Sequence, residues 1–367
     1  MAGSFPRFWA ALLLACPAGP AAAARGAAKA PPRAAFALDA DALKRYGIDP
    51  RFIVAVRPAG ASARTVIGEH LPGRGSVLHV LAPDGSHLHA LAVPSPQLAD
   101  FSVDPSGREA FLVGSYGTRF YAADLVRKRS RLVYASLPDR PGFRALAPVS
   151  IAQTARGPVV YGVFYRDETA TLDVGFARVR PNGTASNVLS TRGWSERLGP
   201  VSGYSPHPKL ESGLVVRGAR SGPGKGRALA YAAAEGDGRE LDAADDIYGV
   251  SWAPDGERFA YVRRRGEKAE LMLGSAGGQP ARLAEGFFFA PVFVDGGRSL
   301  VVGKIEGKTQ GAWIVSLPEG RLERLELPAG PFVHAADPTG ATLVAWGPWG
   351  LRTFRFEGGS ARAAGGR

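Results

Sequence analysis

A short turn that recurs along the chain, with an apolar stretch on each side, constrains the fold more than any other feature. The turn contains Asp and Gly, usually with Pro, and its clearest copies lie at residues 104–107, 254–256, 295–297 and 337–340. In such a turn Pro presets φ, Asp accepts hydrogen bonds from the backbone, and Gly takes the position with positive φ. Each copy therefore joins two antiparallel strands, and the chain is a repeat array.

The spacing of these turns predicts the architecture. Asp255, Asp295 and Asp337 are 40 and 42 residues apart, and four-stranded propeller blades repeat every 40–45 residues. The 48 Gly and 29 Pro exclude a solenoid of paired helices. We predict an all-β chain that forms a single β-propeller of four-stranded antiparallel blades. Seven units are counted, and they open at Arg51, Phe101, Pro148, Val201, Tyr248, Phe289 and Phe332. Six blades is the alternative, because the third and fourth units lack the Asp-Gly turn.

The first 24 residues have the layout of a secretory signal. Arg7 precedes the apolar run 8–15, and prolines and a tract of alanines follow it. This run is shorter than the roughly 20 residues that cross a bilayer. The single cysteine, Cys16, follows Leu-Leu-Ala as in a bacterial lipoprotein box, so it is a lipidation candidate; the alternative is a signal cleaved after the alanines. We expect an exported protein, periplasmic or anchored to the outer membrane as a lipoprotein, whose mature body has no disulfide.

The predicted domain boundaries follow from composition. Residues 25–37 are an Ala-, Pro- and Arg-rich tether with little to bury. Residues 38–46 form either a short helix or a segment across the propeller. The expected organisation is therefore a signal peptide at 1–24, a tether and short N-terminal segment at 25–48, and the propeller domain at 49–367.

The fifth unit carries a family resemblance. Residues 251–261 read Ser-Trp-Ala-Pro-Asp-Gly-Glu-Arg-Phe-Ala-Tyr, and residues 275–283 read Ser-Ala-Gly-Gly-Gln-Pro-Ala-Arg-Leu. Together they resemble the two halves of a TolB-like (WD40-like, PD40) propeller repeat. The resemblance implies a binding propeller at the cell envelope. Because the first blade is expected to begin near Asp49, we expect no counterpart of the separate N-terminal domain of TolB. The repeat is also similar to the propellers of prolyl-oligopeptidase-type peptidases, and we expect no counterpart of their hydrolase domain either.

Candidate metal ligands and catalytic groups were weighed against structural roles. The turn aspartates occupy equivalent places in different blades, which favours a role in the turns. His79, His87 and His89 share one hairpin. With Asp84-Gly85 as a two-residue turn, His87 and His89 lie on one face and His79 on the other. Three ligands cannot meet from opposite faces, so the hairpin is interpreted as an exposed outer strand. The functional alternative is a zinc or copper site with two histidines. We predict no metal and no cofactor.

Charge placement suggests a binding surface. The formal net charge of +12 favours acidic partners, and no nucleic-acid recognition motif is present. The connections between second and third strands are basic, and the opposite end collects the turn aspartates. The predicted basic binding set is Arg119, Arg166, Lys225, Arg227, Arg263, Arg264, Arg265, Lys304 and Lys308.

The sequence contains no recognisable catalytic set, because Gly-x-Ser-x-Gly and zincin motifs are both missing. We therefore predict an exported, non-enzymatic, TolB-like binding propeller. It is expected to be a monomer that binds an envelope protein or an acidic glycan or peptide, and to contact the membrane only through an N-terminal lipid. The alternative is a propeller hydrolase or lyase with an active site at the channel mouth. Trp252, just before a turn, is expected to pack between neighbouring blades.

Overall fold

The computed structural model describes residues 32–93, 97–114, 120–134, 143–154, 157–166, 171–179, 185–190, 203–210, 212–218, 226–233 and 238–356. The predicted signal peptide and Cys16 lie outside these ranges, so export and lipidation stay predictions. Pro32 begins a compact unit, and all the elements below belong to it. No described helix is long and apolar enough to cross a membrane.

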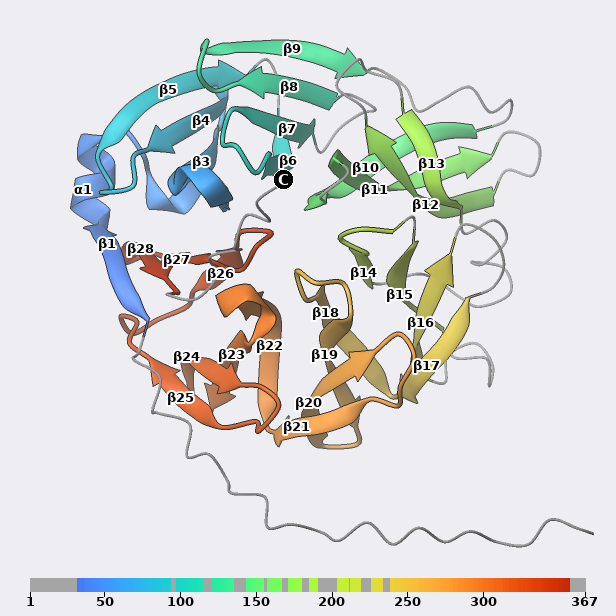
Figure 1. Ribbon diagram of the computed structural model, residues 1–367. Helices are drawn as coiled ribbons and strands as arrows, with labels where there is room; N and C mark the ends of the chain where they lie inside the picture. Colours follow the sequence, from blue (N-terminus) through green and yellow to red (C-terminus); the bar gives the residue numbers. More distant parts are fainter. Residues whose placement is uncertain are drawn as a thin grey trace, which may run out of the picture. The chain divides into compact units, whose positions relative to one another are not determined.

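The unit contains seven four-stranded antiparallel sheets, arranged around a central axis in Figure 1. We number these blades in chain order. Blade 1 comprises β2 (Ile53–Ala59), β3 (Arg64–Leu71), β4 (Gly75–Leu81) and β5 (His87–Val93). Blade 2 comprises β6 (Leu98–Val103), β7 (Glu109–Gly114), β8 (Phe120–Asp124) and β9 (Arg129–Tyr134). Blade 3 comprises β10 (Phe143–Thr154), β11 (Gly157–Arg166), β12 (Thr171–Val179) and β13 (Ala185–Ser190).

The remaining blades follow the same order from the axis outward. Blade 4 comprises β14 (Gly203–Pro206), β15 (Ser212–Gly218), β16 (Arg227–Ala233) and β17 (Arg239–Ala244). Blade 5 comprises β18 (Asp246–Trp252), β19 (Arg258–Arg265), β20 (Lys268–Ser275) and β21 (Ala281–Glu285). Blade 6 comprises β22 (Phe287–Val294), β23 (Ser299–Glu306), β24 (Thr309–Ser316) and β25 (Leu322–Leu325). Blade 7 comprises β26 (Val333–Ala336), β27 (Thr342–Gly347), β28 (Gly350–Arg355) and, at its outer edge, β1 (Arg33–Asp39).

The ring closes between blades 7 and 1. Each innermost strand contacts the innermost strand of the next blade, including β26 with β2, which confirms the seven-bladed propeller. Buried apolar residues fill the spaces between blades; one cluster joins Val56 and Ile67 of blade 1 to Val344 and Leu351 of blade 7. Blades 3 and 4 keep four strands although they lack the Asp-Gly turn, so the six-bladed alternative is wrong.

The segment before the first blade corrects one expectation. The last part of the predicted tether, from Arg33, is strand β1, which pairs antiparallel with β28. Its short alternation of Ala with Phe36 and Leu38 buries apolar side chains against blade 7, a contact that composition does not reveal. The propeller therefore begins at Arg33 and not at Asp49. Residues 38–46 include the short helix α1 (Ala40–Arg45), whose N-terminus is capped by the Asp39 carboxylate. Of the two expectations for this segment, the helix is therefore confirmed.

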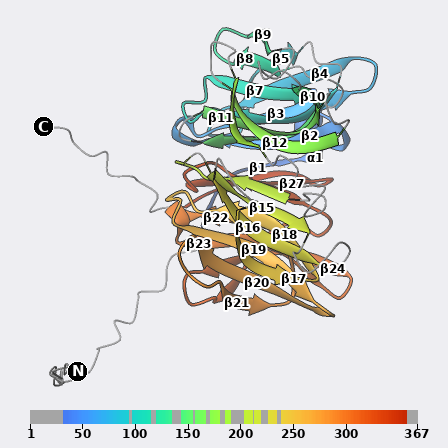
Figure 2. The same ribbon diagram turned by 90° about the vertical axis from the view of Figure 1, so that its right-hand side faces the viewer.

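The meander gives the ring two different ends. We call the end with the first-to-second and third-to-fourth strand connections the turn end. The other, with the second-to-third connections and the crossings between blades, is the loop end. Figure 2 shows strands running across the ring from one end to the other. The described residues also include the short 3-10 helices η1 (Pro50–Phe52), η2 (Gly60–Ser62) and η3 (Asp295–Gly297).

Candidate functional site: the central cavity

A cavity of about 840 Å³ lies on the axis and is lined by residues from all seven blades. The lining comes from the ends of the innermost strands and the turns that follow them, so the cavity belongs to the turn end. Its polar residues are Arg57, Ser102, Gln153, Thr154, Ser205, Lys209, Ser251, Asp255, His334, Asp337 and Thr339. Six prolines complete much of the wall: Pro58, Pro105, Pro206, Pro208, Pro254 and Pro338.

The prolines and hydroxyls define what the cavity offers a ligand. Proline has no N–H group, so the proline wall supplies apolar rings and carbonyl oxygens. Hydroxyls of serine and threonine both donate and accept hydrogen bonds. The residues that shape the repeated turns therefore also form the wall of the cavity.

An ion pair connects three blades beside the cavity. Arg57 Nη2 donates to Asp100 Oδ1 at 2.6 Å, and Arg57 Nε donates to the Phe101 carbonyl at 3.0 Å. The second carboxylate oxygen of Asp100 accepts the Ile151 N–H at 3.2 Å. Arg57 and Asp100 are only 28% and 13% exposed. The pair therefore fixes blades 1, 2 and 3 relative to one another.

The carboxylates of the turn aspartates accept hydrogen bonds from the backbone of their own turns. Asp104 Oδ1 accepts the N–H groups of Arg108 and Glu109, both at 2.7 Å. Asp337 is buried and accepts from the backbone of Thr339 and Thr342. These contacts confirm the structural role predicted for the two residues.

The other two turn aspartates also bond locally. Asp255 accepts the Glu257 N–H at 2.8 Å and pairs with Arg258 at 3.2 Å. Asp295 has a φ of 56° and pairs with Arg298 Nη2 at 2.7 Å. The predicted structural role is confirmed for these residues too.

His334 lines the cavity from blade 7 but is buried in the wall. Its Nε2 lies 2.7 Å from the carbonyl oxygen of Ala290 in blade 6, which requires Nε2 to carry the hydrogen. Burial lowers the pKa of His334 to about 4. At neutral pH the ring is therefore uncharged and joins two blades.

The histidine hairpin differs from the sequence prediction. Val80 pairs with His89 and His79 with Ala90, as expected, but a bulge at Leu88 makes His87 the partner of Leu81. Because a bulge shifts the following side chains to the other face, His87 lies on the same face as His79. The expected separation of those two rings is wrong. In the described ranges, no group of three or more His, Cys, Asp or Glu is placed to hold a metal ion.

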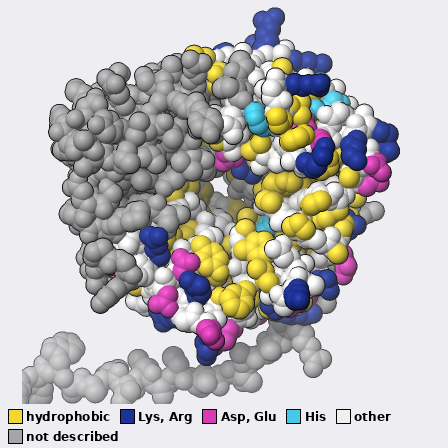
Figure 3. All heavy atoms as spheres, turned by 180° about the vertical axis from the view of Figure 1, so that it is seen from behind, with side chains coloured by type: hydrophobic (Ala, Val, Ile, Leu, Met, Phe, Trp, Pro, Cys, Tyr) yellow, Lys and Arg dark blue, Asp and Glu magenta, His cyan; other side chains and the backbone are white. Residues whose placement is uncertain are grey.

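The described members of the predicted basic set belong to the loop end, away from this cavity. Arg119 and Lys225 lie outside the described residues, Arg166 ends β11, and Arg227 begins β16. Arg264, Arg265 and Lys308 are exposed. Lys304 is 20% exposed and bonds Glu306 at 2.7 Å. Figure 3, which shows this end, places hydrophobic side chains beside the central opening and most described Lys and Arg farther out.

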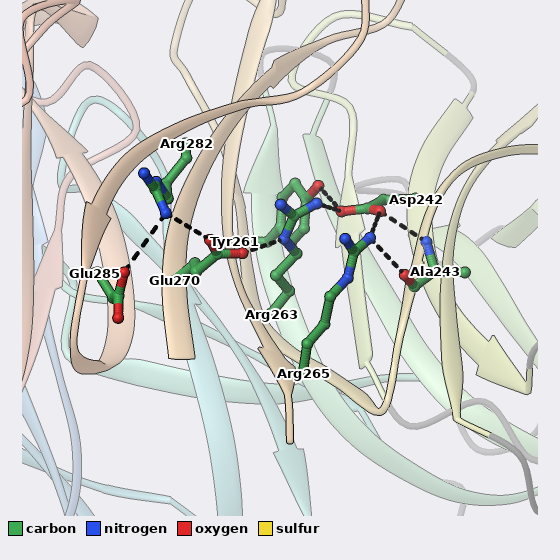
Figure 4. A network of polar contacts seen from close by, with 8 residues as sticks. All are labelled: Asp242, Ala243, Tyr261, Arg263, Arg265, Glu270, Arg282 and Glu285. Atoms are coloured by element: carbon green, nitrogen blue, oxygen red, sulfur yellow. Dashed lines mark hydrogen bonds and ion pairs between the residues drawn. The ribbon is translucent and has the colours of Figure 1, made fainter. Parts of the chain in front are cut away.

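Arg263 is held inside a network that joins blades 4 and 5 (Figure 4). Its guanidinium donates to Asp242 at 2.9 Å and to Glu270 at 2.7 Å, and its side chain is 16% exposed. Hydrogen bonding from Arg263 lowers the pKa of Glu270, while burial and the Asp242 carboxylate raise the pKa of Tyr261. Arg263 is thus engaged within the fold, and a role of the basic set in binding stays a prediction.

The sequence predicts a channel, but it predicts neither the residues that line the cavity nor the Arg57–Asp100 pair. The one signal was Arg57 at the end of the apolar run 52–56. Its partners are 43 and 44 residues away in the chain, so only the folded ring reveals them.

Comparisons with known proteins support the fold. No family model and no curated protein matches the chain. The solved structures that resemble it include oligogalacturonate lyase from Vibrio parahaemolyticus, with a TM-score of 0.61, 8% identity, and coverage of 83% of this chain and 89% of that one. Hydrazine synthase from Kuenenia stuttgartiensis gives a TM-score of 0.56 at 14% identity, covering 84% and 97%.

A third similar structure is the β-propeller domain of Cps50 (Swd1) from Myceliophteria thermophila. Its TM-score is 0.52 at 11% identity, and the match covers 83% of this chain and 96% of that domain. At such identities the likeness concerns the fold alone. The chain is a seven-bladed β-propeller.

Proposed function

We propose that this protein is a non-enzymatic binding propeller of the bacterial cell envelope, TolB-like in role, whose ligand enters the central cavity from the turn end. The observation that carries the proposal is the state of the charged groups that line the cavity. Arg57, Asp255 and Asp337 are engaged by partners within the fold, and His334 bonds a carbonyl. A general acid or base must instead be within reach of its substrate.

Lys209 suggests the chemistry of the ligand. It is exposed at the cavity, and among the charged lining residues it is the one whose charged group has no hydrogen bond or ion pair with another described residue. The hydroxyls of Ser205 and Ser251 stand in the same wall, whereas the hydroxyl of Thr339 already donates to Asp337. We propose a ligand with an anionic group for Lys209 and with acceptors for the hydroxyls, such as an acidic peptide or glycan.

Affinity capture from envelope extract tests this function. Ser251→Trp puts a large ring into the cavity, and Lys209→Glu reverses its accessible charge, so both variants should lose the captured component. Ser130→Trp on β9, the outermost strand of blade 2, is the matched control and should retain it. Capture unaffected by both cavity variants would place the binding site elsewhere.

The alternative function, a hydrolase or lyase, is tested with the same chains. Oligogalacturonate is a suitable first probe because one similar structure bears the name of its lyase. We expect no turnover by the wild-type chain. Turnover that Ser251→Trp abolishes would replace the binding function by an enzymatic one. Fractionation of cells that produce the full chain tests export separately, and retention in the cytoplasm would contradict it.

A further inference from the structure

Two histidine ring nitrogens face each other in blade 1, and neither histidine lines the central cavity. His79 Nδ1 and His87 Nε2 are 3.4 Å apart, and the ring centroids are 5.6 Å apart at an interplanar angle of 49°. The bulge at Leu88 creates this pair, because without it the two rings would lie on opposite faces of the hairpin.

The separation matches two ligands of one metal ion. Nitrogen ligands lie about 2.0–2.1 Å from Zn²⁺, and at a tetrahedral angle two of them are about 3.3 Å apart. Adjacent nitrogens of a tetragonal Cu²⁺ site are about 2.8–2.9 Å apart, so Cu²⁺ would draw the two rings closer by about half an ångström. The same separation also permits a long hydrogen bond between the rings. Metal binding and a simple hydrogen bond are therefore the two interpretations to be distinguished.

The surroundings of His79 favour metal binding. His79 Nε2 lies 3.1 Å from Glu69 Oε2, and the two side chains are 5% and 0% exposed. A carboxylate accepts, so Nε2 donates and the lone pair of Nδ1 points toward His87. Metal-bound histidines characteristically donate their second ring nitrogen to a carboxylate, which orients the ring and raises its basicity.

The carboxylate and the second ring are fixed in turn. Glu69 Oε1 accepts the Asp49 N–H at 2.8 Å. Tyr46, at the end of helix α1, stacks on His87 with centroids 5.3 Å apart and an interplanar angle of 23°. Tyr46 and Asp49, which follow α1, therefore hold His87 and Glu69 in place.

We propose that His79 Nδ1 and His87 Nε2 bind one divalent transition-metal ion, with Cu²⁺ the tightest of the series because imidazole sites follow the Irving–Williams order. Glu69 acts as a positioning residue. The described part of the chain places no third His, Cys, Asp or Glu at this site, so water or a donor from a bound molecule completes the coordination. This inference is independent of the function proposed for the central cavity.

Copper titration of the full chain, made without a histidine tag and freed of metal by chelator, tests the site. Isothermal calorimetry should give one Cu²⁺ per chain, and electron paramagnetic resonance should show two nitrogen ligands. His87→Ala should abolish this binding, and Glu69→Gln should weaken it by about tenfold or more. His89→Ala, two residues away on the opposite face, should leave it unchanged.

His87→Ala is the decisive variant because His87 is only partly buried, and its thermal unfolding shows whether it is folded. His79→Ala is secondary, since it leaves Glu69 buried without its partner. A wild-type chain without one-to-one binding, or an affinity that is the same in folded His87→Ala, would overturn the proposal and leave the two rings as a hydrogen-bonded pair.

Discussion

Two junctions between blades stand beside the central cavity and are built from opposite kinds of interaction. Between blades 4 and 5, the Trp252 ring packs against His207 and Phe259 with centroids 4.7 and 5.4 Å apart. Across blades 1 to 3, the contact is the Arg57–Asp100 ion pair. Burial of an aromatic ring contributes stability directly, whereas a largely buried ion pair gains little over an apolar contact but is costly to break. The first junction stabilises the propeller, and the second fixes the positions of blades 1 to 3 relative to one another.

The largest effect should come from the aromatic junction. Trp252 is 8% exposed, and its Nε1 donates to the Ser205 carbonyl of blade 4 at 3.1 Å. Trp252→Ala should lower the free energy of unfolding in urea by about 3–5 kcal/mol, as large-to-small core changes do. Trp252→Phe serves as the control and should cost less. A loss below about 1 kcal/mol for Trp252→Ala would refute the assignment of this ring as the main junction.

Acid should weaken a third junction, the one that His334 makes between blades 6 and 7. Its pKa is about 4 in the fold and about 6.5 in an unfolded chain. The unfolded state therefore takes up the proton first, so stability is complete above pH 6.5 and falls as the pH drops toward 4. The loss attributable to this group is about 3 kcal/mol.

The matched variant for this pH dependence is His334→Gln, which cannot titrate. Unfolding in urea at a series of pH values should show a smaller loss on acidification in the variant than in the wild type. Equal slopes in the two chains would mean that other groups cause the acid sensitivity.

Breaking the ionic junction should have a smaller effect. Asp100→Asn leaves Arg57 without its charge partner and should destabilise the chain by about 2 kcal/mol, less than for a fully buried pair because both groups keep some contact with water. The double variant Arg57→Met/Asp100→Leu should recover part of this loss in the same urea measurement. If the double variant is less stable than Asp100→Asn, the pair contributes net stability and the contrast between the two junctions is weaker than we infer.

The smallest effect is expected for a charge outside any junction. Arg264 is exposed at the loop end, so Arg264→Glu should change the unfolding free energy by less than about 0.5 kcal/mol. Arg263→Glu is its neighbour and contrast, because it would place a third carboxylate between Asp242 and Glu270 and should be clearly destabilising. Similar melting temperatures for the two variants would contradict the network of Figure 4.

The sequence predicted the blades well because the turn carries its own chemistry. Asp255, Pro254 and Gly256 specify a tight turn whatever surrounds them, and the apolar run after each turn specifies a buried strand. Trp252 was placed between blades for the same reason, and its burial confirms that prediction. These are local signals, and local signals survive in a single sequence.

The rest depends on partners far along the chain or on a one-residue irregularity. Strand β1 is identifiable only through its pairing with β28, more than three hundred residues away. The face of His87 is decided by one bulged residue, Leu88. The cavity needs all seven blades to exist, so neither its wall nor the engagement of its charged groups could be predicted.

Strand β1 also has a consequence for how the chain behaves as a polymer. Arg33 pairs with Arg355, so the beginning and the end of the described fold meet in one sheet, and the ring cannot close until the last blade has been made. Once the last blade has been made, and until β1 pairs with it, β28 presents an unpaired edge to solvent, and such an edge accepts a strand from any chain that offers one. The β1 segment of a second molecule fits that edge as well as its own, so the closure that seals the ring is also the place where two chains can exchange strands.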